Sequence, residues 1–159
     1  MMKTEKSNQG WDEMKRVLIV DDDQGICDFI AEVVESAGYQ AAHANNSHEM
    51  IRVLEGGLPD LMIIDLIMPD RDGVECLEMM ARMEGFASLP ILMMSGFDKT
   101  MLAIAQKFGS ERGLNMVGVL NKPFSVSGLR DRIDQAFACD AASSRLGTTA
   151  DAPAFRSVS

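Results

Sequence analysis

The sequence is poor in the residues that would point to a disulfide scaffold or a metal cluster of histidine and cysteine. It has three cysteines, Cys27, Cys76 and Cys139, which are widely spaced and include no Cys-x-x-Cys pair. An odd number of separated cysteines disfavours a disulfide framework or a zinc site and suits reduced thiols. The two histidines, His43 and His48, have no partner spacing typical of a metal site, so we expect them at the surface or in packing.

Positive charge and long apolar runs are also scarce. Lys and Arg number 15 against 24 Asp and Glu, which gives a net charge of -9. Nucleic acids and anionic membranes attract proteins through a basic face, so we expect neither as a direct partner. The first 16 residues lack the apolar stretch of a signal peptide, and no run elsewhere is long enough to span a bilayer. We therefore expect a cytoplasmic location.

The sequence does contain short apolar runs that alternate with amphipathic stretches. The apolar runs lie at 17–20, 61–64, 91–94 and 117–120, with a more polar run at 39–44. Helical spacing of apolar residues covers 24–37, 46–55, 74–84, 98–111 and 125–137. Unbroken apolar runs of this length are typical of strands buried on both faces of a parallel sheet. The alternation predicts an α/β fold: a doubly wound, five-stranded parallel sheet with helices on both faces, and 39–44 near its edge.

The two ends of the chain differ from this pattern. Residues 1–15 are polar and mixed in charge, and we interpret them as a flexible N-terminal arm with Trp11 as its one large aromatic side chain. Residues 16–138 form the predicted domain. Residues 139–159 contain few large apolar side chains, so we expect a disordered C-terminal tail.

Polar residues with complementary chemistry end four of the predicted strands. Asp21 and Asp22 follow the first, Asp65 the third, Ser95 the fourth and Lys122 the fifth. The carboxyl ends of parallel strands share one edge of the sheet, which is where α/β proteins bind ligands. A single Asp after a strand most often only caps a helix or turns the chain. Four strands that end in this way predict a functional site.

This set resembles the receiver domain of two-component response regulators over about residues 16–138. The matching motifs are Val20-Asp21-Asp22, Asp65 with Met68-Pro69 and Gly73, Ser95-Gly96, and Lys122-Pro123-Phe124. The resemblance implies a flavodoxin-like (βα)5 fold and a stand-alone receiver. Its phosphoryl group would come from a histidine kinase or a histidine phosphotransfer protein, and its output would be a contact with a protein partner.

Clustered carboxylates form a hard-oxygen site suited to Mg²⁺. We expect Asp22 and Asp65 to be direct ligands and Asp21 to act through water, and the family pattern adds the backbone carbonyl of Ile67. Asp65 is then the expected phospho-acceptor, which forms an aspartyl-phosphate. Lys122 would neutralise a phosphoryl oxygen, and the Ser95 hydroxyl would donate a hydrogen bond to one.

The resemblance also implies a cis Lys122–Pro123 bond and a switch. Movement of Ser95 toward the phosphoryl group would change the surface formed by the fourth helix, the fifth strand and the last helix. Many members of the family carry an aromatic residue on the fifth strand where this chain has Val119, so that part of the switch is missing. We expect a monomer or a phosphorylation-dependent dimer.

Two alternatives stay open at this point. One is a receiver-like scaffold that is not phosphorylated. The other is a Mg²⁺-dependent phosphatase of the haloacid dehalogenase type, but that family has a second Asp two residues after its nucleophile, where this chain has Ile67. Except for promoting its own phosphorylation and dephosphorylation, we expect no enzymatic activity.

Ile67 and Phe97 lie two residues beyond Asp65 and Ser95, at positions that flank the phosphoryl site. We predict that they exclude the hydrolytic water, so Ile67→Asn should lose the phosphoryl group severalfold faster than the wild type. The rate of phosphoryl loss can be followed by intact mass after removal of the phosphodonor. An equal or slower rate in the variant would contradict this prediction.

Overall fold

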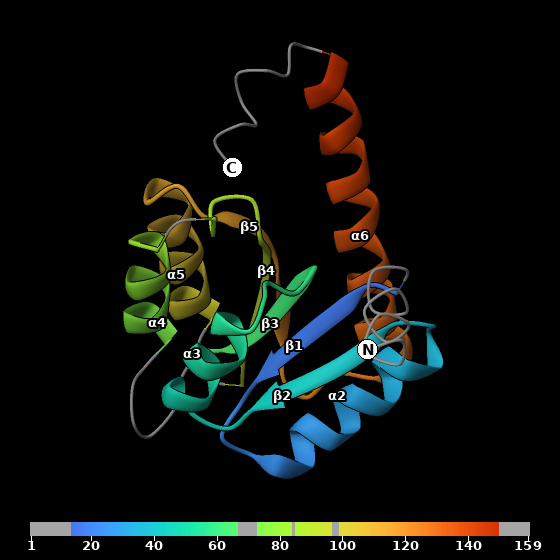
Figure 1. Ribbon diagram of the computed structural model, residues 1–159. Coiled ribbons are helices and arrows are strands. Elements are labelled where there is room, and N and C mark those ends of the chain that lie inside the picture. Colours follow the sequence, from blue (N-terminus) through green and yellow to red (C-terminus); the bar gives the residue numbers. More distant parts are fainter. Residues whose placement is uncertain (1–13, 67–72, 84, 97–98, 150–159) are drawn as a thin grey trace, which may run out of the picture.

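The computed structural model describes residues 14–66, 73–83, 85–96 and 99–149, and its centre is a parallel sheet of five strands (Figure 1). The strands are β1 (Arg16–Val20), β2 (Gln40–Ala44), β3 (Leu61–Asp65), β4 (Pro90–Ser95) and β5 (Asn115–Asn121). The helices are α2 (Gln24–Ser36), α3 (Ser47–Glu55), α4 (Gly73–Ala81), α5 (Lys99–Glu111) and α6 (Val126–Thr149). All neighbouring strands pair in parallel, in the order β2-β1-β3-β4-β5. The predicted doubly wound fold is confirmed.

Two apolar cores lie on opposite faces of the sheet, because alternate side chains of each strand point to opposite sides. On one face, α2 and α6 cover the odd-numbered residues of β1 and β3, among them Ile19 and Ile63. On the other, α3, α4 and α5 cover the even-numbered residues, among them Leu18 and Ile64. Figure 1 shows the same division, with α2 and α6 on one side of the strands and α3, α4 and α5 on the other.

Polar side chains fix where the helices begin. Asp23 caps α2 by accepting hydrogen bonds from the backbone N–H groups of Gly25 and Ile26. Asn46 caps α3 by accepting from the N–H of Glu49, and the Glu49 carboxylate accepts in return from the N–H of Asn45 at 2.7 Å. This is close to the capping box that the sequence indicates, although the returning bond is made one residue before the cap.

The C-terminal helix differs from the sequence prediction. α6 continues past Cys139 to Thr149, whereas a disordered tail was predicted from residue 139. Ala141 and Ala142 favour helix, and no proline lies between the start of α6 and Pro153, so a helix nucleated by the packed first half can propagate. In Figure 1 this half of α6 projects beyond the sheet. Residues 150–159 lie outside the described residues, as do residues 1–13, which hold most of the predicted N-terminal arm and Trp11.

The end of α4 also differs slightly. The predicted helix reached Glu84, but α4 ends at Ala81. The next two N–H groups, those of Arg82 and Met83, bond to carbonyls three residues back, which is how a helix tightens at its end. Glu84 itself is outside the described residues. Within those residues, no helix is long and apolar enough to cross a membrane.

Replacing a core isoleucine should cost much more stability than replacing an exposed one. Ile63 is fully buried on β3, and Ile104 on α5 is 56% exposed. Ile63→Ala should lower the free energy of unfolding by about 2–4 kcal/mol, because it removes buried methylene groups and leaves a cavity. Ile104→Ala, the matched control, should change it by less than about 0.5 kcal/mol. Urea unfolding measures both; equal losses in the two variants would contradict the assignment of the core.

Candidate functional site: an acidic pocket at the sheet edge

The register of the strands brings the predicted polar residues to one edge of the sheet. Val20 pairs with Ile64, so the next residues, Asp21 and Asp65, emerge side by side. Ser95 ends β4 opposite Asn121, and the N–H of Lys122 donates to the Ser95 carbonyl at 2.9 Å. The four strands that carry these residues therefore end at one level.

Three carboxylates form the centre of the pocket. Asp21, Asp22 and Asp65 each offer an oxygen, and these oxygens all lie within 4.8 Å of one another. Asp21 is fully buried and Asp65 is 6% exposed, whereas Asp22 is exposed to solvent. Carboxylates held this close repel one another, and a cation among them offsets that repulsion. The cluster therefore fits a hard divalent cation with oxygen ligands and open positions for water.

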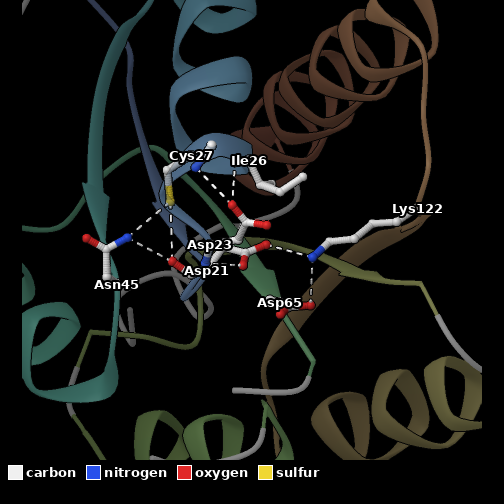
Figure 2. Close-up of polar contacts among 8 residues, drawn as sticks. Asp21, Asp23, Ile26, Cys27, Asn45, Asp65 and Lys122 are labelled. Carbon is white, nitrogen blue, oxygen red and sulfur yellow. Dashed lines mark hydrogen bonds and ion pairs between the residues drawn. The ribbon is translucent and has the colours of Figure 1, made fainter. Parts of the chain in front are cut away.

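Lys122 supplies the positive charge of the pocket (Figure 2). Its Nζ lies 2.7 Å from Asp21 Oδ2 and 3.4 Å from Asp65 Oδ1. Burial alone would lower the pKa of Lys122, but the hydrogen bond to Asp21 and the charges of Asp65 and Asp21 outweigh this and raise it. The ammonium is thus held in its charged form between two strands. The Lys122–Pro123 peptide bond is cis, as the resemblance implied.

The close approach of Lys122 to the end of β4 depends on Gly96. A Cβ on Gly96 would lie 3.3 Å from the Cβ of Lys122, tighter than nearly all such contacts. Glycine at this position leaves room for the lysine stem to pass along β4 to the carboxylates. This gives a steric reason for the Ser95-Gly96 pair that the sequence motif contains.

Burial and the neighbouring charge of Asp21 raise the pKa of Asp65 from 3.8 to about 6. Lys122 opposes this shift without cancelling it. The negative charge of Asp65 is therefore only partly compensated in the pocket without a metal. An additional cation beside Asp65 would favour its ionised form.

The three consecutive aspartates have different tasks. Asp23 caps α2 and does not belong to the carboxylate cluster within the described residues. The N–H of Asp23 donates to Asp21 Oδ1 at 2.9 Å, and the N–H of Asp21 donates to the carbonyl of Ala44. Asp21 is thus fixed by its own loop and by β2, while Asp22 is the exposed member of the carboxylate cluster. This division explains why three carboxylates occur in succession.

Some predicted residues cannot be placed, and two contacts were not foreseen. Ile67, Met68, Pro69 and Phe97 are outside the described residues. Val119 is partly buried against the core under α3, α4 and α5. The side chains of Cys27 and Asn45 bond to the carbonyl of Asp21. The sequence indicated only a reduced thiol at Cys27, and nothing in it pointed to Asn45.

A flavodoxin-like sheet with an acidic pocket and a lysine at its carboxyl edge defines a class of signalling domain. The chain matches the response regulator receiver domain over residues 17–134, and it belongs to that family. Receiver domains are signalling domains that generally bind Mg²⁺ through an acidic pocket and interact with histidine kinases and downstream targets.

Particular relatives support the assignment. The chain is 29% identical to the response regulator receiver protein CpdR of Brucella abortus over 122 residues, which cover 77% of this chain and 96% of that protein. It is 26% identical to protein Rrf1 of Nitratidesulfovibrio vulgaris over 123 residues, 77% of this chain and 83% of that protein. A CheY-like receiver domain protein from Methanospirillum hungatei superposes with a TM-score of 0.69 at 25% identity, covering 82% and 98% of the two chains.

Other relatives are considerably longer than the region that matches. The chain spans 35%, 47% and 48% of the length of three transcriptional regulators to which it is similar. The match to these proteins therefore concerns only part of each of them.

The raised pKa of Asp65 predicts a pH-dependent cost of folding. A folded-state pKa of about 6, above the ordinary 3.8, means that the folded chain binds the proton more tightly. Stability is then lost as the pH rises between these values. Asp65→Asn should therefore be more stable than the wild type by about 1–3 kcal/mol at about pH 8, with little difference near pH 4.

Urea unfolding without divalent cations, at about pH 4, 6 and 8, measures this difference. Asp131→Asn removes an exposed carboxylate of α6 and is the matched control, with no expected gain. A wild type as stable as Asp65→Asn at the highest pH would contradict the prediction.

Proposed function

We propose that this chain is a Mg²⁺-dependent phospho-acceptor receiver whose acceptor is Asp65. The observation that carries the proposal is the pocket itself: two buried carboxylates and an exposed one within 4.8 Å, with the Lys122 ammonium against Asp21 and Asp65. Membership of the receiver family also favours a phospho-acceptor over the phosphatase alternative.

The donor set fits a magnesium ion, which takes few protein ligands and keeps several waters. Asp22 and Asp65 would bind it directly, Asp21 would act through water, and the backbone carbonyl of Ile67 would complete the protein ligands. When bound, the ion neutralises the oxygens of the incoming phosphoryl group.

Asp65 then acts as the nucleophile. One of its carboxylate oxygens forms a bond to phosphorus while the P–N bond to the histidine of the donor protein breaks. The bonding pair stays on the imidazole nitrogen, which leaves as a neutral ring when its other nitrogen carries a proton. Lys122, already 3.4 Å from Asp65, can donate to a phosphoryl oxygen, and the Ser95 hydroxyl can donate to another.

The output is a contact with a protein partner. Ser95 and Lys122 are joined through the backbone where β4 meets β5, so a shift of either side chain toward the phosphoryl group moves this edge. The surface affected is that of α5, β5 and α6, and this is the surface expected to contact the partner. A cytoplasmic location goes with this role, as does either a monomer or a phosphorylation-dependent dimer.

The decisive experiment is intact mass after incubation with a small phosphodonor, such as acetyl phosphate, and Mg²⁺. We expect a gain of one phosphoryl group in the wild type and in Asp131→Asn, which keeps the pocket intact. No gain is expected in Asp65→Asn or when the metal is chelated, because the nucleophile or the neutralising charge is then missing.

If the small phosphodonor gives no phosphorylation, a second phosphodonor is tested. A histidine phosphotransfer protein loaded with phosphate tests whether the chain accepts only from a protein donor. No transfer from either donor to a folded wild type would overturn the proposal and favour the scaffold alternative. Turnover of a generic phosphomonoester, with release of phosphate, would instead support a phosphatase.

A further inference from the structure

The backbone carbonyl of Asp21 accepts hydrogen bonds from two side chains outside its own loop (Figure 2). Asn45 Nδ2 donates to it at 3.0 Å, and the Cys27 thiol donates to it at 3.3 Å. The same Asn45 nitrogen lies 3.7 Å from Cys27 Sγ. A β2–α3 loop residue and an α2 residue therefore converge on one atom of the acidic pocket.

The position of this carbonyl matters because it belongs to the peptide between Asp21 and Asp22. The peptide is planar, so hydrogen bonds that hold its oxygen restrict ψ of Asp21 and φ of Asp22. These two angles set the directions in which the Asp21 and Asp22 carboxylates leave the backbone. Two hydrogen bonds to the carbonyl thus act on the geometry of two of the three carboxylates of the cluster.

Repulsion makes such a constraint necessary. Lys122 lies against Asp21 and Asp65, and Asp22 is the exposed member of the cluster. An exposed carboxylate beside two buried ones lowers its energy by turning away into water. The hydrogen bonds to the Asp21 carbonyl restrain the backbone of Asp22. This restraint limits the movement and keeps the Asp22 carboxylate near the cation site.

Both donors are themselves well fixed. The N–H of Asn45 donates to Glu49 Oε1 at 2.7 Å, which ties this residue to the first turn of α3. Cys27 is fully buried on α2. Its thiol S–H is a hydrogen-bond donor and lies 3.3 Å from the Asp21 carbonyl oxygen.

We propose that Asn45 and Cys27 are positioning residues that orient the Asp21–Asp22 peptide and so set the affinity of the pocket for Mg²⁺. The inference rests on the proposed function, since it assigns these residues to its metal site. Neither side chain would touch the ion. Their effect passes through the carbonyl of Asp21 alone.

The test is a Mg²⁺ titration of the unphosphorylated protein, followed by amide shifts in two-dimensional NMR spectra. Asn45→Ala and Cys27→Ala should each weaken Mg²⁺ binding by about 10-fold, the effect typical of residues that orient metal ligands. Cys27→Ser restores a hydroxyl donor at nearly the same place, so it should recover most of the affinity lost in Cys27→Ala.

Asn46→Ala is the matched structural control. It removes the cap of α3 next to Asn45 and should cost about 1 kcal/mol of stability in urea unfolding. Because Asn46 makes no hydrogen bond to the Asp21 carbonyl within the described residues, the Mg²⁺ affinity of the Asn46→Ala variant should stay within about twofold of the wild type. Loss of stability without loss of affinity separates a structural role from a positioning role.

The outcomes distinguish this inference from the proposed function. If the wild type binds Mg²⁺ and both Asn45→Ala and Cys27→Ala bind it equally well, the positioning role is overturned and the proposed function stands. Equal weakening in Cys27→Ser and Cys27→Ala would also count against the donor argument. A folded wild type that binds no Mg²⁺ would overturn the proposed function and this inference together.

Discussion

Parallel strands β1 and β3 place the carboxylates of Asp21 and Asp65 in one buried space, and the Lys122 ammonium is the cation that offsets their repulsion. This charge balance is incomplete, since two buried negative charges meet one positive charge. The raised pKa of Asp65 is the direct sign of that imbalance. The pocket is therefore a place where the fold gives up stability and gains affinity for a further cation.

The surrounding structure limits how the pocket can relax. The two apolar cores fix the strands on both faces, so the ends of β1 and β3 cannot move apart without exposing buried side chains. Asp23 anchors the loop to α2, and the contacts of the Asp21 backbone tie it to β2 and to Asn45. Repulsion among the carboxylates thus acts against a rigid frame and persists.

The parts of this arrangement that the sequence predicts are those controlled by local pattern and topology. Apolar runs identified four of the five strands and a more polar run identified the edge strand β2, and parallel topology brought Asp21, Asp65 and Lys122 to one edge. The choice of Asp21 as the nearer partner of Lys122 depends on side-chain geometry, which no spacing encodes. The contact of Asn45 with Asp21 joins residues 24 apart through tertiary packing, so it too is invisible in the sequence. Helix α6 ran past the predicted boundary because the rule applied there concerned apolar content, whereas helix propagation needs only favourable local residues.

The absence of an aromatic residue at position 119 bears on how a signal would leave the pocket. Val119 is partly buried against the core and has no ring to rotate. The pocket is then connected to β4 and β5 through the backbone. The Lys122 N–H donates to the Ser95 carbonyl, and Gly96 lets the Lys122 side chain lie close to the end of β4. A phosphoryl group on Asp65 adds negative charge beside Lys122, whose shorter contact in the unphosphorylated protein is with Asp21. In the proposed switch, redistribution of this ammonium between Asp21 and the phosphoryl group would pull on β4 and β5 together, so the backbone would carry the change that a rotating side chain carries elsewhere.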